Sequence, residues 1–140
     1  MALSGPRNTP YRQAISLSIG MAPNVTCHQG GMVVVDATGY AMPAKTALNL
    51  VCLGIADATV SNGATVGENA VSVRVGTYRF ASAGGPDQIG QAQLGRVVYL
   101  VDDETVAATN GTNTRSPAGV CVGIDPAGVW VALGPTVRQA

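Results

Sequence analysis

The stretch that decides the fold is LGRVVYLVDDETVAATNGTNTRSPAGVCVGIDPAGVWVAL, residues 94–133. β-Branched and aromatic residues fill positions 96–101, and three acidic residues that disfavour strands end this run at 102–104. A second short strand is predicted over 105–109. The polar run 110–117 cannot bury apolar surface and ends in a proline, which lacks a ladder donor, so it predicts a flexible loop between strands.

The end of this stretch predicts a β-hairpin. Residues 119–124 and 129–133 are valine-rich, and Asp125-Pro126-Ala127-Gly128 separates them. Proline at the second position and glycine at the fourth suit a type I turn. The chain therefore turns back on itself here, with Trp130 in the returning strand.

The composition bounds the class of protein. The 140 residues are 46% hydrophobic and 11% charged, and 18 glycines are spread without a three-residue period, so neither disorder nor a collagen helix fits. This length corresponds to about one domain. The sequence predicts a compact β protein with many turns.

The charged residues form no basic cluster that would bind a polyanion. Eight basic residues balance eight acidic ones and are scattered singly, which argues against nucleic acid or an anionic membrane as partners. No run approaches the roughly 20 apolar residues that span a bilayer, and residues 1–13 lack a signal-peptide core. We expect a soluble protein made in the cytoplasm.

The first half of the chain also contains apolar runs and alternating patterns that predict β-strands. Residues 13–19 alternate, residues 32–35 and 50–56 are apolar runs, and residues 71–80 alternate with Gly76 as a candidate bulge. Residues 83–87 are predicted to form a loop, and residues 88–93 are the only plausible helical turn.

These patterns predict an all-β fold. We expect one β domain over residues 13–140, a small Gly-rich β-barrel or β-sandwich with at most one short helical turn. Residues 1–12 contain two prolines and little that could be buried, so they are predicted to form an extended arm. A frayed terminus and a strap on a neighbouring subunit both fit this arm.

The two halves show a possible internal duplication, roughly 30–56 and 95–125. Strand, acidic turn, short strand, link and a second apolar strand follow in the same order in both. Chance similarity between valine-rich strands is the alternative. If the repeat is real, Gly54 and Gly123 should occupy equivalent places, and a structure in which they do not superpose would argue against it.

The candidate chemical groups predict structural roles. Cys27, Cys52 and Cys121 cannot all pair within one chain, and small buried hydrophobes are the favoured interpretation. His28 is the only histidine and is interpreted as a loop residue.

Two further features are weighed. Asp102-Asp103-Glu104 could in principle hold Ca²⁺ or act in acid-base chemistry, but a solvated turn is favoured. Trp130 is interpreted as a core or subunit-interface residue. No catalytic residue, cofactor or metal ligand is assigned, so we expect a non-enzymatic assembly component.

The stretch 94–106, its Gly/Asn/Thr loop, residues 118–125 and residues 128–131 resemble the capsid decoration, or cement, proteins of tailed bacteriophages. Towards the C-terminus, the sequences of such proteins often show the following order: a glycine and a strand, then Asp-Asp and Thr-Val, then a loop. A strand that begins with glycine follows, then an aspartate, a turn and a strand that begins with Gly-Val. The match covers about the last third of the chain.

The resemblance implies a late virion protein on the outer surface of an icosahedral head. It would bind the major capsid protein, commonly as a homotrimer, and stabilise contacts between capsid subunits. It also favours the strap interpretation of the arm, with Arg7, Tyr11 and Arg12 as capsid-binding residues. A tail or head-fibre base component and a small-ligand or sugar-binding β module are the alternatives.

Overall fold

The computed structural model describes residues 2, 4–8 and 16–134. Within them the protein consists of β-strands and two short 3-10 helices, with no α-helix, which confirms the predicted all-β fold. No helix in this described part is long and apolar enough to cross a bilayer.

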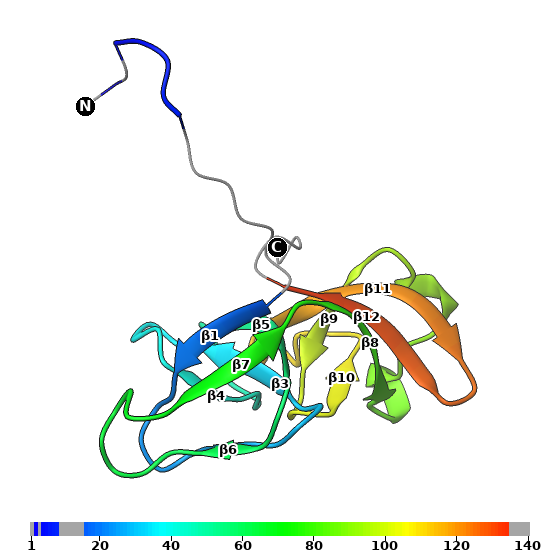
Figure 1. Ribbon diagram of the computed structural model, residues 1–140. Coiled ribbons are helices and arrows are strands. Elements are labelled where there is room, and N and C mark those ends of the chain that lie inside the picture. Colours follow the sequence, from blue (N-terminus) through cyan, green and yellow to red (C-terminus); the bar gives the residue numbers. More distant parts are fainter. Residues whose placement is uncertain (1, 3, 9–15, 135–140) are drawn as a thin grey trace.

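The first half of the chain forms what we call the N-terminal sheet (Figure 1). Its five strands are, in spatial order, β1 (Ser16–Gly20), β7 (Ala70–Arg74), β5 (Val51–Ala56), β3 (Met32–Val35) and β4 (Ala41–Pro43). All neighbours are antiparallel, and an isolated parallel bridge between Met21 and Ala41 links the two edges. The short strands β2 (Thr26–Cys27) and β6 (Val60–Ser61) pair separately.

The second half closes into what we call the C-terminal barrel. Its strands are, in order, β8 (Gly76–Ser82), β12 (Gly128–Leu133), β11 (Pro117–Asp125), β9 (Val97–Leu100) and β10 (Thr105–Ala107). β8 and β10 close it in parallel, and the other pairs are antiparallel. The predicted hairpin is confirmed, with Asp125 opposite Gly128 at its turn.

Several predicted boundaries differ from the structure. The predicted strand 105–109 ends at Ala107, and the first strand begins in the described residues at Ser16. The bulge predicted at Gly76 is wrong, because Arg74 ends β7 in the N-terminal sheet and Gly76 begins β8 in the C-terminal barrel. The side-chain alternation resets there because the chain changes sheets.

The helical content also differs slightly. A 3-10 helix, η2 (Gln91–Gln93), falls within the predicted turn at 88–93, and a second, η1 (Gly85–Asp87), replaces part of the predicted loop. Pro86 lies in the first turn of η1, where its fixed φ suits a helix and its missing N–H leaves nothing unpaired. The protein thus has one more helical turn than the sequence predicts.

The two halves repeat one strand order and one register. The order β1-β7-β5-β3-β4 matches β8-β12-β11-β9-β10 strand for strand. Val33 pairs with Gly54 as Val98 pairs with Gly119. We call two residues equivalent when they occupy the same place in these two ladders.

The other ladders keep the same correspondence. Ile55 faces Arg74 as Val120 faces Ala132, and the parallel contact between Met21 and Ala41 recurs between Ser82 and Val106. Every pair of neighbouring strands in the five-stranded N-terminal sheet thus has its counterpart in the C-terminal barrel, while the β2–β6 pair has none among the described residues.

The prediction that Gly123 is equivalent to Gly54 is wrong. The register makes Gly119, and not Gly123, the counterpart of Gly54. A Cβ at Gly54 would collide with the carbonyl oxygen of Arg74, and a Cβ at Gly119 with that of Ala132. The two glycines therefore serve the same close approach between strands.

The apolar core has two parts. One cluster lies within the N-terminal sheet, around Val33, Val71 and Val73. The larger cluster fills the C-terminal barrel and extends to side chains of β3 and β5 that include Met32 and Val34. The second half of the protein is therefore packed against the first through a shared core.

Candidate protein-binding surface

The predicted capsid-binding residues lie at the N-terminal end. Arg7 belongs to the exposed segment 4–8, and Tyr11 and Arg12 lie outside the described residues. The strap formed by residues 1–12 thus stays a prediction.

The cysteines are buried, as predicted. Burial raises the pKa of Cys27 to about 11, with a smaller contribution from the charge of Asp103, and raises the pKa of Cys52 to about 12. Because the thiolate is the nucleophile, burial and the raised pKa both lower the reactivity of these two thiols in the folded protein. His28 lies exposed in the loop between β2 and β3, as predicted, and no metal-binding group of His, Cys, Asp or Glu occurs among the described residues.

An exposed tryptophan is fixed on the outside of the C-terminal barrel. Trp130 on β12 pairs with Arg79 on β8, and its side chain is 37% exposed. Its Nε1–H donates to Oδ2 of Asp125 at 2.8 Å, and Cζ of Arg79 lies 5.7 Å from the ring centroid. We call Arg79, Asp125 and Trp130 the Trp130 cluster.

Electrostatics reinforce this arrangement. The hydrogen bond from Trp130 lowers the pKa of Asp125, helped by backbone N–H groups of Ala127 and Gly128 and by the charge of Arg79, whose Nη1 lies 3.9 Å from Oδ2. The carboxylate therefore stays ionised and holds the indole in one orientation. A cation over an indole face adds a further attraction.

The Trp130 cluster has no counterpart in the N-terminal sheet. The residues equivalent to Trp130 and Arg79 are Ser72 and Ser18, which pair with each other between β7 and β1. The repeated scaffold therefore does not require an aromatic residue at this position, and the C-terminal barrel alone carries one.

Two other apolar side chains of the second half are exposed. Val122 is 50% exposed and adjoins Gly123, which pairs with Trp130. Leu94 is 47% exposed and precedes Gly95, whose N–H donates to the carbonyl oxygen of Cys121. Exposed apolar residues that lie close together mark contact surfaces, and Val122 and Trp130 lie on paired strands.

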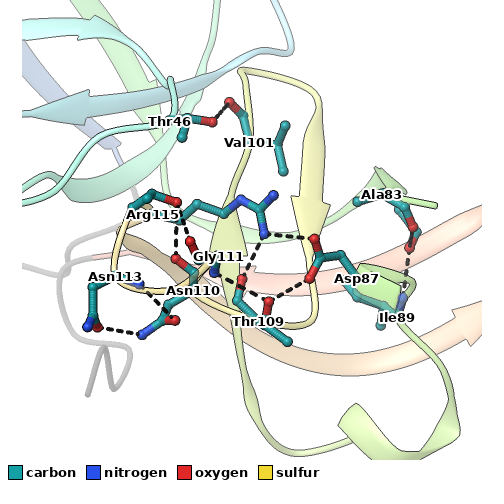
Figure 2. A network of polar contacts seen from close by, with 12 residues as sticks. Thr46, Ala83, Asp87, Ile89, Val101, Thr109, Asn110, Gly111, Asn113 and Arg115 are labelled. Carbon is teal, nitrogen blue, oxygen red and sulfur yellow. Dashed lines mark hydrogen bonds and ion pairs between the residues drawn. The ribbon is translucent and has the colours of Figure 1, made fainter. Parts of the chain in front are cut away.

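A separate polar network fixes the loop before β11 (Figure 2). Asp87 accepts hydrogen bonds from the hydroxyl of Thr109 and pairs with Nη1 of Arg115 at 3.2 Å. The bond from Thr109, followed by Arg115, lowers the pKa of Asp87. The amides of Asn110 and Asn113 are joined at 3.1 Å, so the predicted flexible loop is tied down by its own side chains.

A hollow of about 280 Å³ lies between the end of β8, the residues Gln88 and Ile89 that follow η1, and the β11–β12 turn. Its carboxylate, that of Asp125, already accepts the N–H groups of Ala127, Gly128 and Trp130. The carboxylate of Asp125 therefore stabilises the hairpin turn, and it is not directed at a ligand in the hollow.

No family model matches the chain, and the comparisons with curated proteins and with solved structures also found no match.

The sequence had pointed to Trp130 but not to its partners. Trp130 as an interface residue stays a prediction, while Asp125 was interpreted only as a turn residue and Arg79 only as a strand residue. The hairpin spacing could have found Asp125, because Asp125 and Trp130 flank the same tight turn. Arg79 depends on the pairing of β8 with β12, which no local pattern indicates.

Proposed function

We propose that this protein is a structural virion component that binds the outer surface of an icosahedral phage head as a homotrimer and stabilises contacts between major capsid subunits. The sequence resemblance to capsid decoration proteins supports this proposal. The structural observation that supports it best is the Trp130 cluster, a preformed aromatic surface on a rigid β-barrel. It requires no cofactor and no catalytic group.

The physical chemistry of the Trp130 cluster suits protein binding. Tryptophan and arginine are enriched among the residues that contribute most to the free energy of protein–protein association. Because Asp125 and Arg79 already hold the ring, little side-chain entropy is lost when a partner covers it. In a trimer, three such surfaces bind one head together, so each contact can be weak.

The direct test mixes the purified protein with expanded heads that lack it and measures pelleting. We expect saturable binding, with a plateau that reports the number of sites per capsid subunit. Absence of binding by the folded protein would overturn the proposal and favour a tail component or a ligand-binding module.

The contribution of Trp130 is tested with Trp130→Ser, which installs the side chain found at the equivalent position in the N-terminal sheet. We expect the dissociation constant for heads to rise about 30-fold, the effect of losing roughly 2 kcal/mol at a central aromatic contact. The matched control is Val66→Ser, since Val66 is a 46% exposed apolar residue in the first half. Equal effects of both variants would contradict a special role for the Trp130 cluster.

The arm is tested separately by deleting residues 2–12. A strap that contains Arg7, Tyr11 and Arg12 adds contacts with the capsid, so the shortened protein should bind heads more weakly than the full chain. Unchanged head binding after this deletion would remove the strap from the proposal and leave the barrel surface as the contact.

A further inference from the structure

The two halves of the chain pack head to tail, and not as a symmetric pair. Met32 and Val34 of β3 and Cys52 of β5 are completely buried and belong to the cluster that fills the C-terminal barrel. We call the surface of the N-terminal sheet that carries these three residues its wall. On the other side of the contact, Leu100, Ser116 and Ala118 are 0%, 2% and 0% exposed. We call these three residues the edge of the C-terminal barrel.

Polar contacts join the two halves. The Ser116 hydroxyl donates to the carbonyl oxygen of Ala47 at 2.6 Å and accepts the N–H of Leu50 at 3.0 Å. The hydroxyl of Thr46 donates to the carbonyl oxygen of Val101 at 2.8 Å (Figure 2). These hydrogen bonds join the β4–β5 link to the second half, next to the apolar cluster that the wall residues share with Leu100 and Ala118.

The same wall exists on the C-terminal barrel, where it is less covered. The residues equivalent to Met32, Val34 and Cys52 are Val97, Tyr99 and Pro117. All three are partly exposed, whereas their counterparts are completely buried. Among residues 16–134, the second half therefore presents an apolar wall that no described element covers fully.

The same edge exists on the N-terminal sheet, where it is also less covered. The residues equivalent to Leu100, Ser116 and Ala118 are Val35, Val51 and Leu53. Val51 is 45% exposed, while Ser116 is 2% exposed. All three residues are apolar, so this edge is suited to a dry contact.

We infer that a second copy of this chain covers these surfaces. The edge formed by Val35, Val51 and Leu53 in one copy docks on the wall formed by Val97, Tyr99 and Pro117 in the next, and it repeats the contact that already exists within the chain. The repeated register places matching strands on both sides, so the backbones of the two surfaces are arranged as they are in the contact within the chain. This inference rests on the self-association included in the proposed function and names its interface.

The contact is heterologous, because a different surface of each copy takes part. Such contacts close into rings when the rotation between copies allows it. A homotrimer would be one closed ring, in which no edge or wall is left uncovered.

The test measures the mass of the full chain in solution, without heads, by light scattering during size-exclusion chromatography. We expect the wild type to be a trimer. Val51→Asp and Tyr99→Asp should each raise the dissociation constant about 100-fold or more, because an unpaired charge would be buried in the contact. Val66→Asp places the same charge on an equally exposed apolar residue outside both surfaces and should leave the trimer intact.

A mixing experiment tests the head-to-tail arrangement itself. The Val51→Asp copy keeps an intact wall and the Tyr99→Asp copy keeps an intact edge, so a mixture of the two should form a one-to-one dimer that extends no further. If Tyr99→Asp is not folded by circular dichroism, Tyr99→Ala, which introduces no charge, replaces it. A mixture that stays monomeric while each variant is folded would overturn the inference.

The outcomes separate this inference from the proposed function. A wild type that is monomeric in solution, or a Val51→Asp variant that stays trimeric, would overturn the interface even if the protein binds heads saturably. A wild-type trimer that Val51→Asp dissociates, but that does not bind heads, would support the interface and overturn the capsid role.

Discussion

Gly54 and Gly119 occupy the same place in the two halves, where β5 lies close to β7 and β11 lies close to β12. A Cβ would meet a carbonyl oxygen of the neighbouring strand in both cases, and Gly54 also has φ of 152°, which disfavours other residues. We predict that Gly54→Ala and Gly119→Ala each lower the free energy of unfolding by about 1–3 kcal/mol, as overpacking does. Urea unfolding followed by Trp130 fluorescence measures the change.

The control for these glycines is Gly84→Ala. No atom lies within 4 Å of a Cβ built at Gly84, and its φ is −93°, so alanine fits there without strain. Its free energy of unfolding should match that of the wild type. An equal loss at Gly84 would show that the close strand approach does not explain the effect.

At Asp87 the prediction concerns pH. Its pKa is held below the ordinary value of 3.8 by Thr109 and then Arg115, so the ionised carboxylate stabilises the folded state. That contribution is complete above the ordinary pKa and is lost as pH falls through the lowered pKa. We predict that Asp87→Asn destabilises the protein at neutral pH and that the difference from the wild type shrinks below pH 3.8.

The measurement is urea unfolding of both proteins across this pH range. Glu104→Gln serves as the control, since Glu104 is an exposed carboxylate at the β9–β10 turn. A difference between Asp87→Asn and the wild type that stays constant down to the most acidic pH would contradict the assigned role of the carboxylate.

Among the elements, the start of β11 and the link between β4 and β5 are joined by one buried hydroxyl. Ser116 both donates to Ala47 and accepts from Leu50. We predict that Ser116→Ala lowers the free energy of unfolding by about 1–3 kcal/mol, because a buried N–H and a partly buried carbonyl lose their partner. Ser18→Ala on the exposed face of β1 is the control, and a comparable loss there would contradict this explanation.

The elements also show what the sequence could predict. Alternation and turn residues were sufficient for the hairpin and for most strands, since both are local properties. The repeat was detectable in the order of elements, but valine-rich strands align almost equally well at several offsets. Only the close approach of Gly54 to Arg74 and of Gly119 to Ala132 fixes the true register, and that contact joins residues far apart in sequence.

The candidate surface shows the same limit. Trp130 could be singled out because it is the only tryptophan and lies in a predicted hairpin strand. Its exposure and the approach of Arg79 depend on which strands close the barrel, and that pairing is non-local. The arm residues Tyr11 and Arg12 lie outside the described part, so the site predicted from the resemblance is still open to experiment.

For the whole molecule, the shared core determines how the protein unfolds. Met32 and Val34 of the N-terminal sheet pack in the same cluster as Leu100 and Val131 of the C-terminal barrel. Unfolding either half would expose completely buried apolar side chains of the other, and this exposure opposes a partly folded state. We predict a single cooperative transition for both halves.

Two natural probes test this prediction, one in each half. Trp130 fluorescence reports the C-terminal barrel, and labelling of Cys27, located by peptide mass mapping, reports the first half. Cys27 is 1% exposed with a raised pKa, so a thiol reagent reaches it only after local or global opening. Both probes should give the same urea midpoint. Labelling of Cys27 at clearly lower urea than the fluorescence change would show that the part of the first half around Cys27 opens while the barrel stays folded, and the shared core would then not couple that part to the barrel.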